Sequence, residues 1–407
     1  MASIPTDWQH LTRDDIRRMI ADHLHDDPAD FAIRHQGNDF PYALVSTQLK
    51  YLQRAQRKLP SWYAVQAIIP PLAYEQCSSE ATAALKPIDG TRGLDLTLGL
   101  GVDSHYLARQ AREITGLEAH ADLAGITRYN YGLLGQTRVA VQAISAEPFL
   151  QAYDASPFDW IYADPARRDM RGKRVQGLAQ GQPDLTTLWP DLRRVGRRLL
   201  VKASPLLDLR AIPRLLPGLR KVSVHSVQQE VKEVLCTFDL GTETYPAPED
   251  VTLQIVRTDG TQPRRYPLAD WAAASAWPAP PTTPRYLAEP DPAFYQAQVL
   301  PQLLAQHLAD WDAGLSGRLG YYLSQSAPPV GFPGRVFVIE ENWRYQPKAL
   351  KKALRQRHLR RAHVMRRDLP LTVQQMRQQL GVQEGGDAFL IGLTLRGEKR
   401  LLLARRI

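Results

Sequence analysis

Residues Arg92–His105 read RGLDLTLGLGVDSH: a short apolar strand, a turn that contains Gly99 and Gly101, and the start of a helical stretch. Glycine at a strand-to-helix turn lets the backbone approach a ligand closely, and the N-terminus of the next helix favours anionic groups. The stretch therefore predicts a ligand site at this turn. The alternative interpretation is a plain tight turn, in which both glycines serve the backbone alone.

The segments around this stretch predict the fold class. From Arg92 to about Val256, short apolar runs such as FDWIYA and RRLLVKA alternate with helical stretches. This alternation is typical of an α/β protein with a doubly wound, mostly parallel, Rossmann-like sheet. The last runs, KVSVHSV, VLCTFDL and TLQIV, end in a pair with no helical stretch between them, which predicts an antiparallel hairpin at one edge of the sheet.

Two carboxylates indicate which kind of ligand the turn holds. Glu118 stands 17 residues after Gly101, where it can accept hydrogen bonds from both ribose hydroxyls of a nucleoside. A dinucleotide site needs a third glycine and an uncharged route to the pyrophosphate, whereas this chain has Ser104 and Asp95 at those places. Asp95 would face a cation, such as the methionine ammonium of S-adenosylmethionine (SAM). The motif favours SAM over NAD, with Asp95 as a turn cap as the alternative.

A third motif follows the strand FDWIYA and begins at Asp164 and Pro165. A carboxylate and a proline-stiffened turn at the carboxyl end of a central strand lie at the crevice where doubly wound sheets bind ligands. Asp164 is therefore expected to orient a nucleophile and to accept its proton.

The three motifs in this order resemble the class I SAM-dependent methyltransferases. More narrowly, the chain resembles a bacterial family of RNA methyltransferases in which a ferredoxin-like segment and a THUMP-like domain follow the catalytic core. The resemblance covers nearly the whole chain and rests on KLPSW, EQCSSEATAALK, LDLTLGLGVDSHYLA, RYNYGLLG, DPARRD, LVKASPLLDL, QEVKEVL, FPGRVF, LPLTVQQMRQQLGVQEGG and the terminal hairpin.

This resemblance implies roles for individual residues. Asp95, Gly99 and Gly101 would line the methionine end of SAM, Glu118 the ribose, and Asp164 with Pro165 the reacting edge. The cofactor-binding set is Asp95, Thr97, Gly99, Gly101, Glu118 and Ser145. The catalytic set is Asp164, Pro165 and Arg167.

The chain departs from the family pattern at a few places. Leu98 stands where such loops more often have glycine, and Ser145 stands where an acid or amide usually contacts adenine. Ala166 and Arg167 replace a proline and an aromatic that stacks on a flipped base in enzymes that methylate amines. Arg167 would stack through its guanidinium plane or hold a phosphate. Lys202, which closes the fifth strand, would meet a substrate phosphate or remain solvated.

The excess charge of the chain lies in one place. Residues 344–377, called the basic block below, contain eleven Lys or Arg and one acid, whereas the whole chain has a net charge of +9. Clustered cations of this kind indicate a polyanion site, and a solvated helix face is the alternative. The predicted substrate-binding residues are Lys202, Lys351, Lys352, Arg355, Arg360 and Arg361.

Changes of pattern along the chain predict four segments. Residues 1–88 have helical periodicity, and residues 89–270 form the methyltransferase core. Residues 271–330 combine a proline-rich linker, stiff and extended between Pro278 and Pro292, with the ferredoxin-like segment. Residues 331–407 form the basic, THUMP-like α+β domain.

The composition excludes several other classes. With two cysteines and no zinc spacing, the chain has no disulfide framework and no expected metal site. No apolar run is long enough to cross a membrane, and the N-terminus carries no secretion signal, so a cytoplasmic protein without membrane contact is expected. Cys77, a possible nucleophile for methylation at a base carbon, is expected to be a small buried side chain instead.

Together these observations predict a SAM-dependent methyltransferase that acts on structured RNA, with tRNA or rRNA implied by the THUMP resemblance. One alternative is an RNA-binding or ribosome-assembly protein with a degenerate methyltransferase fold. An NAD-dependent oxidoreductase is disfavoured by Asp95 and Ser104.

Overall fold

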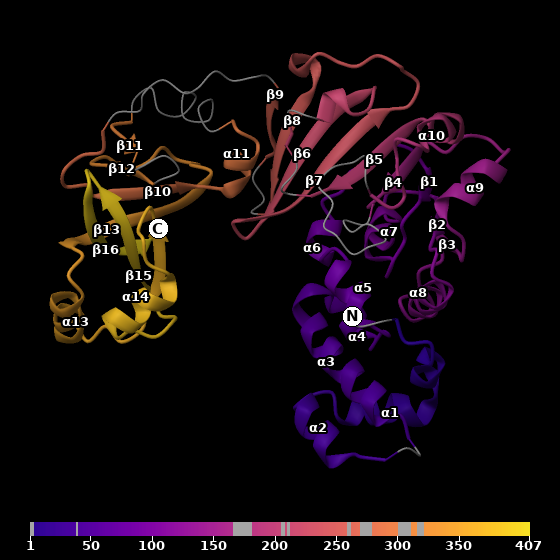
Figure 1. Ribbon diagram of the computed structural model, residues 1–407, viewed down its shortest axis with the longest axis horizontal. Helices are drawn as coiled ribbons and strands as arrows, with labels where there is room; N and C mark the ends of the chain where they lie inside the picture. The colour runs from indigo at the N-terminus through magenta and orange to yellow at the C-terminus, as the bar shows by residue number, and fades with distance from the viewer. Residues whose placement is uncertain are drawn as a thin grey trace. The chain divides into compact units, whose positions relative to one another are not determined.

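A computed structural model describes the chain at residues 4–37, 40–165, 181–204, 208–209, 212–258, 262–268, 279–299, 311–315 and 321–407. The chain divides into two compact units, Met1–Ala269 and Asp270–Ile407. Each unit has its own sheet (Figure 1).

The N-terminal part of the first unit is helical. Its helices are η1 (Trp8–Thr12), α1 (Asp14–Asp22), α2 (Pro28–Arg34), α3 (Tyr42–Lys58), α4 (Pro60–Ala64), α5 (Pro71–Gln76) and α6 (Glu80–Ala83). Leu52 of α3 and Trp62 of α4 are fully buried in the same hydrophobic cluster as Leu100, Leu107 and Tyr162. These helices therefore share one core with the sheet (Figure 1).

The first unit has a nine-stranded sheet in the order β3-β2-β1-β4-β5-β7-β6-β8-β9. The strands are β1 (Arg92–Asp95), β2 (Glu113–Leu117), β3 (Val139–Gln142), β4 (Trp160–Ala163), β5 (Arg198–Ala203), β6 (Leu219–Val227), β7 (Glu230–Asp239), β8 (Thr252–Arg257) and β9 (Arg264–Pro267). The first five pair in parallel, and the helices between them are α7 (Val102–Leu107), α8 (Ala121–Leu133), α9 (Ala146–Ala152) and α10 (Trp189–Val195). The predicted doubly wound, mostly parallel sheet is confirmed.

The predicted hairpin of the last two runs, VLCTFDL and TLQIV, is wrong, because the strands that they form, β7 and β8, do not pair with each other; the antiparallel hairpin lies one run earlier. β6 and β7 pair antiparallel across Gln228 and Gln229, which both have positive φ, as a tight hairpin turn requires. β7 lies between β5 and β6, and β8 pairs in parallel with the other side of β6. The run TLQIV thus extends the sheet in parallel beyond the hairpin of β6 and β7, and β9 becomes the edge strand.

The second unit is an α+β domain with a seven-stranded sheet in the order β11-β12-β10-β13-β16-β15-β14. Its strands are β10 (Tyr286–Pro290), β11 (Gly314–Leu315), β12 (Tyr322–Ser324), β13 (Gly334–Arg344), β14 (His363–Arg367), β15 (Ala388–Leu395) and β16 (Glu398–Arg406). Its helices are α11 (Pro292–Gln296), α13 (Pro347–Gln356) and α14 (Val373–Leu380). A capping box of Thr372 and Gln375 begins α14, and Gly381 ends it with φ +69°.

The prediction of a linker between Pro278 and Pro292 is wrong where the structure describes this segment. Tyr286–Pro290 is an inner strand that pairs with both β12 and β13. Pro290 stands at the end of this strand and Pro292 at the start of α11, two places where proline costs no ladder or helix hydrogen bond. One sheet thus runs across the boundary that we predicted at residue 330.

Candidate functional site

The two glycines of the β1 turn have different surroundings. Gly99 and Gly101 have φ values of +55° and +78°. A Cβ on Gly101 would lie 2.3 Å from the Tyr131 hydroxyl, so close packing requires glycine there. A Cβ on Gly99 would have no heavy atom nearer than 3.9 Å, so space is open beside this residue. Leu98, the departure from the family pattern, is buried and packs against Gly116 on β2.

Glu118, directly after β2, lies beside this open space. Its Oε2 accepts the Gly99 N–H at 3.0 Å, and its Oε1 accepts the His120 N–H at 2.8 Å. Burial raises the pKa of Glu118, while the two backbone donors lower it. Each oxygen retains a further lone pair. The structure thus brings Gly99 and Glu118 together, with the carboxylate held in a fixed orientation.

The Asp95 side chain is buried within the β1 turn instead of facing an open site. It is 1% exposed. Its Oδ1 accepts the Thr97 N–H at 2.9 Å, and its Oδ2 accepts the Ser104 hydroxyl at 2.6 Å. Burial raises the pKa of Asp95 to about 7. These contacts favour the turn-cap interpretation, in which Asp95 shapes the turn, over direct contact with a ligand cation.

The turn after β4, called the β4 turn below, is tied to the β1 turn. The Asp164 N–H donates to the Thr97 hydroxyl at 2.7 Å. The Lys202 ammonium donates to Asp164 Oδ2 at 2.6 Å, and the Asp164 side chain keeps 25% of its surface exposed. Burial raises the pKa of Asp164, whereas Lys202 lowers it. Pro165 follows Asp164 and is half-buried.

Lys202 has a different neighbour from the phosphate that we expected. Because β4 and β5 pair with Ala163 opposite Val201, the ends of the two strands are adjacent. The Lys202 side chain is only 7% exposed and also lies 3.9 Å from Asp103. Burial alone would lower the pKa of Lys202, but Asp164, Asp103 and Glu233 raise it above its ordinary value. Lys202 therefore stays an ammonium paired with Asp164 and is not a solvated side chain, and its contact with a substrate phosphate stays a prediction.

Two further predicted residues lie at or beyond the limits of the site. Ser145 is half-buried and precedes α9, on the far side of β2 from the β1 turn. Arg167 lies outside the described residues, as do Ala166 and Pro205.

Cys77 donates its thiol to the Tyr74 carbonyl at 3.3 Å, and burial raises its pKa to about 11. Cys77 is half-buried and not fully buried as we expected, and its raised pKa disfavours the role of nucleophile.

Charged residues that the sequence analysis did not single out surround Asp164. Lys86 and Glu233 are buried and Asp103 is half-buried, and ion pairs connect the three to Lys202. All three lie in stretches that carried the family resemblance, and the available signal was an ionisable residue inside an apolar run.

The basic block is less uniform in space than in sequence. Four of its arginines form ion pairs with carboxylates outside the block: Arg344 with Glu398, Arg357 with Glu341, Arg367 with Glu289, and Arg377 with Glu384. The predicted residue Lys351 is half-buried, and a Cβ on Gly381 would lie 2.9 Å from its Cε. Arg361 is exposed and donates to the Glu384 carbonyl.

The remaining cations gather on one side of α13. Lys348, Lys352 and Arg355 are exposed at positions i, i+4 and i+7, so they share a helix face, while Leu350 and Leu354 are buried in the core. Arg360 is exposed just beyond the helix. These four residues, called the basic face below, have no ion pair with any described residue.

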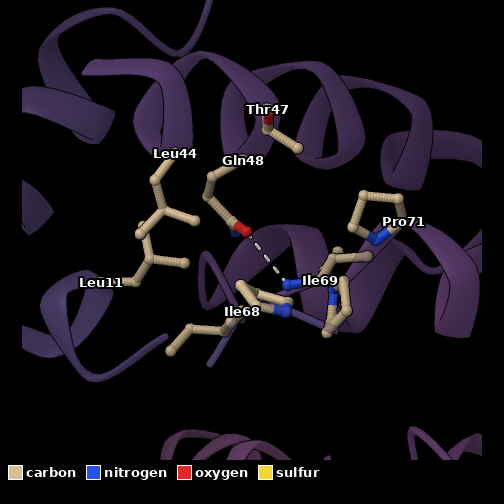
Figure 2. A pocket seen from close by; sticks show the side chains of 9 residues that line it. Leu11, Leu44, Thr47, Gln48, Ile68, Ile69 and Pro71 are labelled. Carbon is tan, nitrogen blue, oxygen red and sulfur yellow. Dashed lines mark hydrogen bonds between the residues drawn. The ribbon is translucent and has the colours of Figure 1, made fainter. Parts of the chain in front are cut away.

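A pocket among the N-terminal helices does not mark the site. Figure 2 shows it lined by apolar side chains such as Leu11, Leu44 and Ile68. The Gln48 amide accepts the Ile69 N–H at 3.1 Å and donates to the Ala67 carbonyl at 2.7 Å. None of the predicted site residues lines this pocket. In the described ranges, no helix is long and apolar enough to cross a membrane, and no cluster of ligand side chains fits a metal ion.

Comparison with known proteins agrees with this architecture. Residues 334–406 match the family model for the THUMP domain-like family. A crystal structure of a Porphyromonas gingivalis W83 protein that bears the name methyltransferase covers 99% of this chain and 100% of its own, with 27% identity and a TM-score of 0.76. The chain shares the fold of this methyltransferase over nearly all of its residues. Its second unit contains a THUMP-like domain, as we expected from the sequence.

Other comparisons are partial. A SAM-dependent methyltransferase from Agrobacterium tumefaciens matches over 40% of this chain and 59% of its own, with 18% identity and a TM-score of 0.29. No curated protein matches the chain.

Proposed function

We propose that this protein is a SAM-dependent methyltransferase that modifies structured RNA of the tRNA or rRNA class. The observation that carries the proposal is that the carboxyl ends of three neighbouring strands lie side by side in a methyltransferase fold. Gly99 after β1, Glu118 after β2 and Asp164 after β4 lie on adjacent parallel strands, joined by the Gly99 to Glu118 and Asp164 to Thr97 hydrogen bonds. Ligands of doubly wound sheets bind outside such strand ends.

The residues at the β1 and β2 turns fit SAM. The open space at Gly99 admits a ligand against the backbone, and Glu118 retains acceptor lone pairs for two ribose hydroxyls. Gly99 and Glu118 would hold the cofactor, with Ser145 toward the adenine and Asp95 and Thr97 shaping the loop from below. When bound, SAM supplies a methyl group on a sulfonium, which is already activated toward nucleophiles.

Asp164 then has two tasks at the acceptor. Its Oδ2 is taken by Lys202, and its Oδ1 has no partner among the described residues, so Oδ1 is free to accept an N–H or O–H of the substrate. The same carboxylate orients the nucleophile and receives its proton.

The RNA part of the proposal rests on the second unit. The basic face offers four exposed cations on and beside one helix of the THUMP-like domain. Phosphate contacts of this kind position a nucleic acid without reading its sequence.

The decisive experiment compares modified nucleosides by mass spectrometry in RNA from strains with and without the gene. One methylated nucleoside should disappear, and purified protein with SAM should restore it. The proposal fails if no methylation changes and calorimetry detects no SAM binding. A protein that binds RNA but not SAM would support the degenerate-fold alternative instead.

A further inference from the structure

A continuous chain of alternating charges runs through the core of the first unit and ends at Asp164. Glu233 Oε2 lies 2.8 Å from Lys86 Nζ, and Lys86 Nζ lies 2.8 Å from Asp103 Oδ1. Asp103 Oδ2 lies 3.9 Å from Lys202 Nζ, which lies 2.6 Å from Asp164 Oδ2. We call these five residues the buried charge chain.

The members of this chain come from distant parts of the sequence and are withdrawn from water. Lys86 and Glu233 have side-chain exposures of 0% and 1%, and Asp103 has 12%. Lys86 follows α6 in the N-terminal helical part, Asp103 is on α7 and Glu233 is on β7. Buried charges are tolerated when each is paired and hydrogen-bonded. Asp103 meets this need with further donors, because Oδ2 accepts the Ser78 hydroxyl at 3.0 Å and the Tyr162 hydroxyl at 2.7 Å.

We propose that Asp103 and Lys86 are positioning residues for the β4 turn, which hold the Lys202 ammonium against Asp164 and so set the orientation and charge of that carboxylate. This inference rests on the proposed function, because only there does Asp164 touch the reacting group. Asp103 is the second carboxylate beside the Lys202 ammonium, at 3.9 Å, and Lys86 in turn pairs with Asp103 and lowers its pKa.

A purely mechanical tie between the N-terminal helices and α7 already exists elsewhere. Glu80 is 5% exposed and accepts hydrogen bonds from the Ser61 N–H at 2.7 Å and from the Tyr106 hydroxyl at 2.6 Å. These bonds join the same two parts of the chain and involve neither Lys202 nor Asp164. The buried charge chain differs because it ends at the β4 turn, and Glu80 therefore offers a matched control.

The charged groups around Asp164 act on its ionisation with opposite signs. Burial raises the pKa of Asp164, Lys202 lowers it, Asp103 raises it and Lys86 lowers it. Asp95 and the Tyr162 hydroxyl also face Asp164, and the Asp164 charge raises the pKa of both. Removal of the Lys86 charge should therefore raise the pKa of Asp164. Loss of the Asp103 charge by itself would lower this pKa, but a Lys202 ammonium that Asp103 no longer holds against Asp164 would raise it, and the effect of Lys202 is the larger of the two. Positioning thus predicts a net rise in both variants, whereas Asp103 as a mere neighbour of Lys202 predicts a fall.

The test titrates Asp164 in the full-length protein. With ¹³C-labelled aspartate, the carboxyl signal of Asp164 is assigned by its loss in Asp164→Asn and followed by NMR from pH 4 to 9. Lys86→Met and Asp103→Asn should both move the midpoint upward, each by about half a pH unit or more. Glu80→Gln should leave it in place. A downward shift in Asp103→Asn, or no shift in either variant, would overturn the proposal.

A milder pair of variants tests the same idea where charge removal prevents folding. Tyr162→Phe removes a donor to Asp103, and Tyr106→Phe removes a donor to Glu80. Tyr162→Phe should lower kcat about threefold or more with an unchanged Kd for SAM, while Tyr106→Phe leaves kcat unchanged. Equal effects of the two variants would contradict positioning. A wild-type protein that transfers no methyl group refutes the proposed function instead, and the NMR titration still decides whether the chain controls Asp164.

Discussion

Charged side chains cluster both at the β4 turn of the first unit and on helix α13 of the second. They are buried at the β4 turn and exposed on α13. Lys86 and Lys202 are almost fully buried and paired with carboxylates at 2.8 and 2.6 Å, whereas Lys352 and Arg355 of the basic face are exposed. Buried pairs are screened little by salt, while exposed charges are screened within about 10 Å at 0.1 M ionic strength. The buried pairs are suited to hold one fixed geometry, whereas the exposed cations are suited to contacts that form and break with a partner.

The strongest test of the first region is Asp164→Ala. We expect methyl transfer to fall by about 100-fold or more, because the variant loses the group that orients the acceptor and takes its proton. The Kd for SAM should stay within about threefold, since the role that we propose for Asp164 is at the acceptor and not at the cofactor. Single-turnover kinetics and calorimetry measure the two quantities. Glu113→Ala, at the opposite end of β2, serves as the control, and turnover near wild type in Asp164→Ala would place the reaction centre elsewhere.

The cost of burial is tested by Lys86→Met. This change leaves the Asp103 and Glu233 carboxylates buried without their shared cation, which should lower the free energy of unfolding by about 3–5 kcal/mol. Arg34→Gln breaks an exposed pair with Asp26 and should have no measurable effect. Urea denaturation of both variants measures the difference. A similar loss of stability in the two variants would mean that burial does not decide how much an ion pair stabilises the protein.

Glu118 and Asp95 allow a finer test. The sequence predicts that both bind the cofactor, whereas in the structure Glu118 lies beside the open space at Gly99 and Asp95 is buried within the turn. Glu118→Gln should weaken SAM binding by about 1.5–3 kcal/mol, since it removes a charged acceptor beside the open space at Gly99. Asp95→Asn should act through the turn, because its oxygens bind Thr97 and Ser104. Calorimetry and thermal unfolding together separate the cases: Asp95→Asn should change stability as well as affinity. Unchanged SAM affinity in Glu118→Gln would remove the predicted ribose contact.

The sequence predicted those parts of the molecule that local pattern controls. The alternation of strands and helices predicted the doubly wound sheet. The glycine turn and the acids after β1, β2 and β4 appear at the predicted strand ends, because parallel strands bring their carboxyl ends to one edge.

Long-range pairing explains what the sequence did not show. Lys86 and Glu233 are 147 residues apart, so no local pattern announces their contact. The strand Tyr286–Pro290 was hidden by its prolines, which stand at its end and in the next helix. In the basic block, the partner acids Glu341, Glu384 and Glu398 lie outside residues 344–377, so a sum along the sequence overstated the charge that is free in space.

That last difference leads to the test of the second region, in which two triple variants change the net charge equally. The first replaces Lys348, Lys352 and Arg355 of the basic face by Gln, and the second replaces Arg344, Arg357 and Arg377, which pair with glutamates, by Gln. If the basic face binds RNA phosphates, the first triple should weaken binding of bulk tRNA. It should also flatten the plot of log K against log salt by about 0.9 for each phosphate that is no longer neutralised, because fewer counterions are released.

The second triple should change both quantities less, because its guanidinium groups are already neutralised by Glu398, Glu341 and Glu384. Gel-shift titrations at two ionic strengths measure both, and SAM affinity should not move in either variant. Equal losses of affinity in the two triples would mean that only the net charge of the unit attracts RNA. If neither triple changes the RNA affinity or the salt slope, the basic face is a solvated helix face. The exposed charges of the second unit then have no role in RNA binding.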